Sequence, residues 1–85
     1  MNTLFANEKR LQRMFGLRHR PERFVKKENA LRFAANCIKS QMVAYLDENP
    51  VGLIPGYYVF CPADFSRLER EAYGIFTYVS PFKSI

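Results

Sequence analysis

The sequence predicts a small α+β domain in which a long central helix packs on a two-stranded sheet. The segment 28–50, ENALRFAANCIKSQMVAYLDENP, carries a broad apolar stripe at helical spacing. The stretches 57–61 (YYVFC) and 75–79 (IFTYV) are rich in β-forming residues. A chain of 85 residues has room for one domain, so residues 1–85 are expected to share one core in the order α-α-β-α-β.

The first predicted helix ends at Phe15. Thr3 suits its N-cap because a hydroxyl can accept a hydrogen bond from a free backbone N–H, and Gly16 suits the C′ position because it tolerates left-handed backbone. Apolar side chains share one side of the helical wheel, namely Leu4, Leu11, Met14 and Phe15. Basic side chains lie on the other side, namely Lys9, Arg10 and Arg13.

The next segment, 17–24, is predicted to be an extended connector. Pro21 disfavours helical backbone at Arg20, the residue that precedes it. Phe24 and Val25 are expected to anchor the end of this connector to the core.

The central helix is predicted to begin after a capping residue, Asn29, and to end at Asn49 and Pro50. Its apolar stripe comprises Leu31, Ala34, Ala35, Ile38, Met42, Tyr45 and Leu46. Further apolar side chains widen the stripe to more than half of the circumference, namely Ala30, Phe33, Cys37 and Ala44. A helix with so wide a stripe is expected to be covered on more than one side.

A shorter helix is predicted between the two strands, over 62–74. Pro62 suits its first turn, Asp64 complements the positive end of its dipole, and Gly74 suits C′. Its core-facing residues would be Phe65, Leu68 and Ala72. The strands could pair in parallel or antiparallel, and neither alternates cleanly between apolar and polar residues. Both faces of the sheet are therefore expected to be at least partly covered.

The net charge of the chain lies in its N-terminal third. Residues 1–28 hold eight Lys or Arg and three acids, a net charge of +5, whereas residues 29–85 hold five of each sign. A basic field of this kind attracts polyanions and acidic proteins. The alternative is that the charge only aids solubility.

Nine residues of this third are the predicted partner-binding set. Most are arginines, whose forked guanidinium grips phosphate or carboxylate in a bidentate manner. Phe15 and Phe24 are interleaved with them, either to stack on bases or, as we favour, to anchor the core. The set comprises Lys9, Arg10, Arg13, Arg18, His19, Arg20, Arg23, Lys26 and Lys27.

The sequence predicts neither catalysis nor a metal or cofactor. Cys37 and Cys61 are 24 residues apart, His19 is the single histidine, and there is no CxxC pair. No glycine-rich loop suits a phosphate, and no base is paired with a nucleophile by any recognisable motif. Both cysteines lie in apolar contexts and are expected to be buried thiols, although a disulfide between them is also possible.

The chain is expected to be a soluble cytoplasmic protein that makes no use of a membrane. Its N-terminus lacks the design of a signal peptide, and the longest apolar segment, VGLIPGYYVFCP, is too short to span a bilayer. A basic amphipathic helix can lie on an anionic membrane, but this one has a modest apolar side that suits the core better.

Two classes of function remain open. In the first, the basic set contacts nucleic acid or a nucleoprotein complex, and six phosphate contacts would give a log–log salt slope of about −5. In the second, the chain is an inhibitor or adaptor, of the kind that phages and mobile elements encode, which docks on an acidic patch of a protein. A homodimer is also possible. The tyrosine anchors of the second class, provided that their side chains are exposed, would be Tyr57, Tyr58, Tyr73 and Tyr78.

Overall fold

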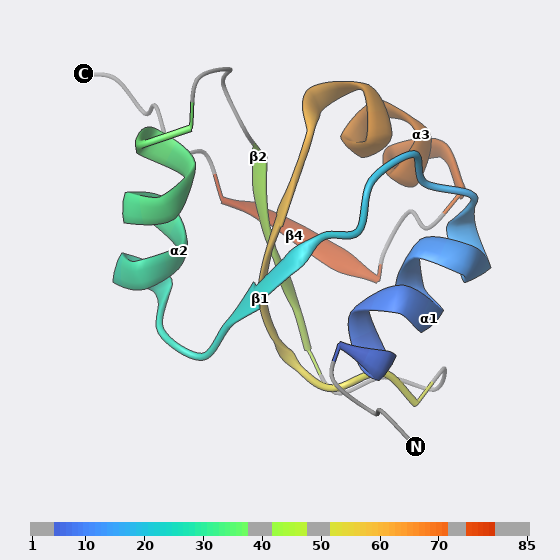
Figure 1. Ribbon diagram of the computed structural model, residues 1–85, viewed down its shortest axis with the longest axis horizontal. Coiled ribbons are helices and arrows are strands. Elements are labelled where there is room, and N and C mark those ends of the chain that lie inside the picture. Colours follow the sequence, from blue (N-terminus) through green and yellow to red (C-terminus); the bar gives the residue numbers. More distant parts are fainter. Residues whose placement is uncertain (1–4, 38–41, 48–51, 72–74, 80–85) are drawn as a thin grey trace.

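The computed structural model describes residues 5–37, 42–47, 52–71 and 75–79 (Figure 1). Within these residues three helices and a four-stranded antiparallel sheet form one compact unit, which confirms the α+β class. The elements in chain order are α1 (Ala6–Phe15), β1 (Glu22–Phe24), α2 (Lys27–Ala35), β2 (Met42–Leu46), β3 (Gly56–Phe60), α3 (Pro62–Glu71) and β4 (Phe76–Val79).

The long central helix predicted over 28–50 is wrong. Its first part forms α2, which begins at Lys27 rather than after Asn29, and its later part, MVAYL, forms the strand β2. Val43 is buried on one face of the sheet while Ala44 and Leu46 are buried on the other. A short apolar run that is covered on both faces has the same composition in a helix and in a strand, so its periodicity did not separate the two.

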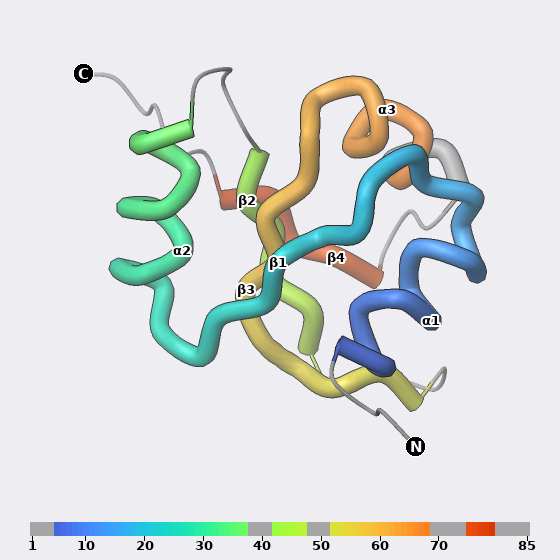
Figure 2. Tube along the Cα trace, viewed as in Figure 1, coloured from blue at the N-terminus to red at the C-terminus, as the bar shows by residue number. Residues whose placement is uncertain are grey.

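The two-stranded sheet and the order α-α-β-α-β are also wrong, because the sheet has four strands in the order β1-β3-β2-β4. The additional strands are β2 and the three-residue β1, which lies inside the predicted connector. The two strands that the sequence predicted, β3 and β4, do not pair with each other because β2 lies between them (Figure 2). Every neighbouring pair is antiparallel, with Tyr58 of β3 opposite both Arg23 and Ala44.

Helices cover both faces of the sheet, as predicted. In Figure 1, α2 lies on one side of the strands and α1 and α3 lie on the other. The smaller core, under α2, is formed by Ala30, Ala34, Val43 and Val59. The larger core, under α1 and α3, is formed by Leu11, Leu17, Ala44, Leu46, Leu53, Tyr58, Phe60, Phe65 and Leu68.

The helix α1 ends as its sequence predicts. Gly16 has φ +63, and its N–H and that of Leu17 close the last turn on the carbonyls of Arg13 and Gln12. Residue 5 precedes the helix, and the predicted cap Thr3 lies outside the described residues. Met14, predicted to face the core, is 42% exposed because the core takes only Leu11 and Phe15 from this helix.

The helix α3 also begins where predicted, at Pro62, and buries Phe65 and Leu68. Ala72 and Gly74 lie outside the described residues. Val25 does not anchor the connector as expected, since it is 72% exposed. Phe24 does anchor it, as predicted, because β1 turns its side chain toward the smaller core.

Candidate functional site

A hollow of about 590 Å³ lies between α1 and the connector that leads from α1 to β1. Its lining contains four cationic side chains and no carboxylate. We call it the basic hollow, and the residues that line it are Lys9, Gln12, Arg13, Leu17, Arg18, His19 and Arg20. The fold therefore brings five of the nine predicted residues together.

One wall of the basic hollow belongs to α1. Lys9 and Arg13 are four residues apart, which places their exposed side chains on the same face of the helix. Leu17, at the start of the opposite wall, is buried in the larger core. The connector is thus anchored to the interior directly beside the residues that carry its charge.

The backbone of the connector is held from two sides. The Gln12 amide Nε2 donates hydrogen bonds to the carbonyls of Leu17 (3.3 Å) and Arg18 (3.4 Å). On the other side, the Asp64 carboxylate accepts the backbone N–H of Arg18 (2.8 Å) and that of His19 (3.0 Å). The side chains of Arg18 and His19 remain exposed, so two charged or polar groups stand on a fixed backbone.

Asp64 is the residue that attaches the connector to α3. Its side chain is 3% exposed, and its pKa reflects two opposing effects. Burial raises the pKa of Asp64, but hydrogen bonds from the N–H groups of Arg18 and His19 and from the Cys61 thiol lower it below its ordinary value. Asp64 is therefore a buried carboxylate that holds its charge at neutral pH.

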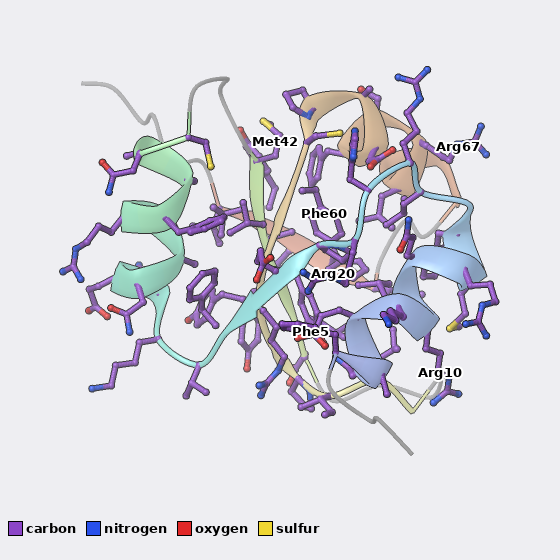
Figure 3. All side chains as sticks on the ribbon, in the orientation of Figure 1. Phe5, Arg10, Arg20, Met42, Phe60 and Arg67 are labelled. Atoms are coloured by element: carbon purple, nitrogen blue, oxygen red, sulfur yellow. The ribbon has the colours of Figure 1, made fainter. Side chains whose placement is uncertain are left out.

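Arg20 is placed by two contacts rather than left free in solvent. Its Nη2 lies 3.3 Å from Oε2 of Glu22, and its guanidinium lies 3.8 Å from the centre of the Phe5 ring (Figure 3). Its Nη1 is buried and has no hydrogen-bond partner among the described residues. Arg20 thus contributes to the basic hollow with part of its charge balanced by Glu22.

The other four predicted residues lie outside the basic hollow. Arg10 Nη1 donates to the carbonyl of Gly52 (3.4 Å). Arg23 donates from Nε (2.9 Å) and Nη2 (2.7 Å) to the carbonyl of Pro55. The exposed pair at the start of α2 lies on the opposite side of the sheet, and this pair is Lys26 and Lys27. The predicted set is therefore divided among separate places on the surface.

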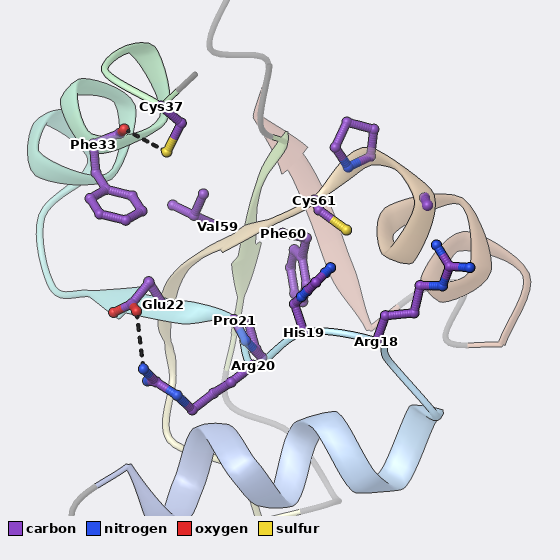
Figure 4. A pocket seen from close by; sticks show the side chains of 12 residues that line it. Arg18, His19, Arg20, Pro21, Glu22, Phe33, Cys37, Val59, Phe60 and Cys61 are labelled. Atoms are coloured by element: carbon purple, nitrogen blue, oxygen red, sulfur yellow. Dashed lines mark hydrogen bonds and ion pairs between the residues drawn. The ribbon is translucent and has the colours of Figure 1, made fainter. Parts of the chain in front are cut away.

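A second hollow, of about 600 Å³, lies on the other side of the connector between α2 and the start of α3 (Figure 4). We call it the apolar groove. The residues that line it are Arg18, His19, Arg20, Pro21, Glu22, Phe33, Cys37, Val59, Phe60, Cys61, Pro62 and Ala63. The segment 18–20 lines both hollows, so the connector forms the wall between them.

Both cysteines line the apolar groove as free thiols, and they are half-buried rather than buried as the sequence suggested. Cys37 Sγ donates to the carbonyl of Phe33 at 3.3 Å. Burial and the nearby Asp64 carboxylate raise the pKa of the Cys61 thiol, which favours its neutral form. Among the described residues, no group of three or more His, Cys, Asp or Glu is placed to hold a metal ion.

Tyr58 is a core residue and not the exposed anchor that the sequence suggested. Its side chain is fully buried, and burial raises its pKa. Its hydroxyl accepts a hydrogen bond from Asn7 Nδ2 (2.7 Å) and donates one to the carbonyl of Ile54 (2.5 Å). Of the other proposed anchors, Tyr78 is 47% exposed and Tyr57 is half-buried against Tyr45, at 4.7 Å between ring centres; Tyr73 lies outside the described residues.

The sequence could not have identified Asp64 as the attachment point of the connector, because its partners are 45 and 46 residues away along the chain.

The described part of the chain contains no helix with the length and apolar character needed to cross a membrane. No protein-family model, curated protein or solved structure matches this chain.

Proposed function

We propose that this chain is a non-catalytic binding protein that uses the basic hollow to engage nucleic acid. The observation that supports the proposal is the convergence of cations from two separate segments on one hollow without a lining carboxylate. Lys9 and Arg13 come from α1, whereas Arg18 and Arg20 come from the connector. Such a cluster suits a ligand that carries several negative charges along its length.

The connector favours this role because its backbone is already ordered. Hydrogen bonds to Gln12 and Asp64 hold residues 17–19, so a ligand would order only the tips of the Arg18 and His19 side chains. A site that is ordered before binding loses less conformational entropy when the ligand arrives.

The number of cations in the basic hollow sets the expected dependence of binding on salt. Four cations, rather than the six used in the sequence-based estimate, would give a log–log slope of about −3 to −4, depending on whether the strand is single or double. Because Glu22 already balances part of the charge of Arg20, the expected slope is closer to about −3 than to −4.

The test is a fluorescence-anisotropy titration with labelled duplex DNA and single-stranded RNA over about 50 to 200 mM salt. The expected result is saturable binding whose slope is about −3. Absence of binding at the lowest salt, or a slope near zero, would contradict the proposal. The same cations would then be a docking site for an acidic partner protein, which is the other function that the sequence left open.

A further inference from the structure

We propose that the apolar groove accepts one unstacked base of a single-stranded nucleic acid whose neighbouring phosphates lie in the basic hollow. This inference rests on the proposed function and adds the strand type and the second half of the site. The observation that carries it is the shared wall, because Arg18, His19 and Arg20 line both hollows. A nucleotide has a similar division, because one sugar joins a charged phosphate to a flat base whose two faces are apolar.

The chemistry of the groove suits a base. Its apolar lining includes Val59 and Phe60 of β3, which are 3% and 2% exposed, and Phe33 of α2, which is 39% exposed. Figure 4 shows Phe33 and Cys37 on one side of Val59, and His19 and Cys61 on the other. Any base can stack on an aromatic ring, so such a groove would accept bases without strong sequence preference.

The charges around the groove favour a ligand that is anionic at one end. Arg18 and Arg20 stand on the connector wall, where a phosphate that follows the base would pass. The one carboxylate that lines the groove is Glu22, and it lies 3.3 Å from Arg20 Nη2. Charge complementarity therefore points to a nucleotide rather than to an apolar peptide or a second copy of the chain.

The preference for a single strand over a duplex follows from the need to place one base inside the groove. A base inside a duplex is paired and stacked, and to bring it into a groove beside its own phosphate costs a few kcal/mol. A single strand offers unstacked bases at little cost. We therefore expect the groove to contribute to the binding of single strands and not of duplexes.

The test compares three labelled ligands of equal length on the intact chain: a thymidine strand, the same strand with abasic sites in place of every base, and a duplex. The thymidine strand is expected to bind about tenfold more tightly than the abasic strand, from one stacked base. Equal binding of all three would overturn the groove inference while the proposed function stands. If none of the three ligands binds, both the groove inference and the proposed function are overturned.

Two variants locate the effect. Phe33→Ala should lower the affinity for the thymidine strand to that for the abasic strand and leave abasic binding unchanged. Ile54→Ala is the matched control, because Ile54 is an apolar side chain of similar exposure (47%) that lines neither hollow. Equal losses in the two variants would contradict a role for the groove.

A second measurement does not depend on the folding of a variant. Cys37 lines the groove, so a bound base should slow the alkylation of its thiol by iodoacetamide. Mass spectrometry measures the alkylation rate. The thymidine strand is expected to protect Cys37 several-fold more than the abasic strand at equal occupancy of the protein. Equal alkylation rates with the two strands would overturn the inference.

Discussion

A single buried carboxylate, that of Asp64, connects the charged surface of this protein to its core. It accepts the backbone N–H groups of Arg18 and His19 and lies in the first turn of α3, whose Phe65 and Leu68 are buried in the larger core. A hydrogen bond to a charged acceptor is stronger than one between neutral groups. Asp64 therefore determines where the cations of the connector stand without contacting a ligand itself.

Replacement of Asp64 by Asn should lower the free energy of unfolding by about 1 to 3 kcal/mol, because the Asn amide cannot accept both N–H groups. Urea unfolding at neutral pH measures this loss. Glu28→Gln is the matched control, since Glu28 is an exposed acid in the first turn of α2 and its change removes a similar helix-dipole interaction. A loss in Asp64→Asn no greater than in the control would show that the two hydrogen bonds contribute nothing.

The contribution of Asp64 should also depend on pH. The pKa of Asp64 in the folded state lies below its ordinary value of 3.8, so its stabilisation is present above that pH and is lost as the pH falls through the folded pKa. The difference in free energy of unfolding between the parent chain and Asp64→Asn should be constant between about pH 5 and 7 and decrease below about pH 4. Urea unfolding across this range is the measurement. If the difference in free energy of unfolding is undiminished at the lowest pH, the stabilisation does not come from the ionised Asp64 carboxylate.

Among the elements, β3 depends on a particular backbone conformation where it begins. Gly56 has φ +151, and a Cβ placed there would lie 3.1 Å from the carbonyl oxygen of Phe24 and 2.9 Å from Arg23 Nε. The oxygen belongs to the neighbouring strand β1 and cannot move without loss of the pairing between β1 and β3. A glycine at this position is what allows the two strands to approach each other.

Gly56→Ala should therefore destabilise the fold more than Gly16→Ala does. At Gly16, with φ +63, the nearest atom to a new Cβ is the flexible end of Arg67 at 3.3 Å, so the cost is mainly backbone strain of about 1 to 2 kcal/mol. At Gly56 the steric conflict adds to the strain, and we expect a total of about 3 kcal/mol. The midpoints of urea unfolding measure this difference, and the midpoint of Gly56→Ala is expected to lie below that of Gly16→Ala. Equal midpoints would mean that β1 moves away from β3 at little cost.

At the scale of the whole molecule, the sheet separates the basic residues into groups. The basic hollow lies on the side of α1 and α3, whereas Lys26 and Lys27 lie at the start of α2 on the other side. A ligand bound in the basic hollow can therefore use only part of the charge of the N-terminal third. If the basic residues acted only through a diffuse electrostatic field, their positions on the surface would have little effect on the affinity for the ligand.

Two variants with equal charge distinguish these possibilities. Arg13→Glu with Arg18→Glu, and Lys26→Glu with Lys27→Glu, each lower the net charge of +5 by four units at exposed positions. The first pair should weaken nucleic-acid binding about 100-fold and reduce the salt slope by about two, and the second should have a small effect. Both should unfold within about 1 kcal/mol of the parent. Equal losses of affinity would show that the interaction is diffuse.

Local chemistry in the sequence determined the class of the fold, the start of α3 and its buried residues Phe65 and Leu68, the C-terminus of α1, and the strands β3 and β4. These features depend on neighbours within a few residues, such as Gly16 after α1, Pro62 at the start of α3 and the β-branched or aromatic runs of the strands. The concentration of positive charge before residue 29 is also a property of sequence alone.

Only the tertiary structure decided the features that depend on partners far along the chain. Residues 42–46 form a strand because β3 and β4 flank them and cores lie on both faces, although their composition also suits a helix. Arg18 and His19 lie at the hollow because Asp64 accepts their N–H groups across more than 40 residues. The choice of strand over helix and the grouping of the cations follow from contacts that no local pattern encodes, because burial and hydrogen bonding are completed only when distant segments pack together.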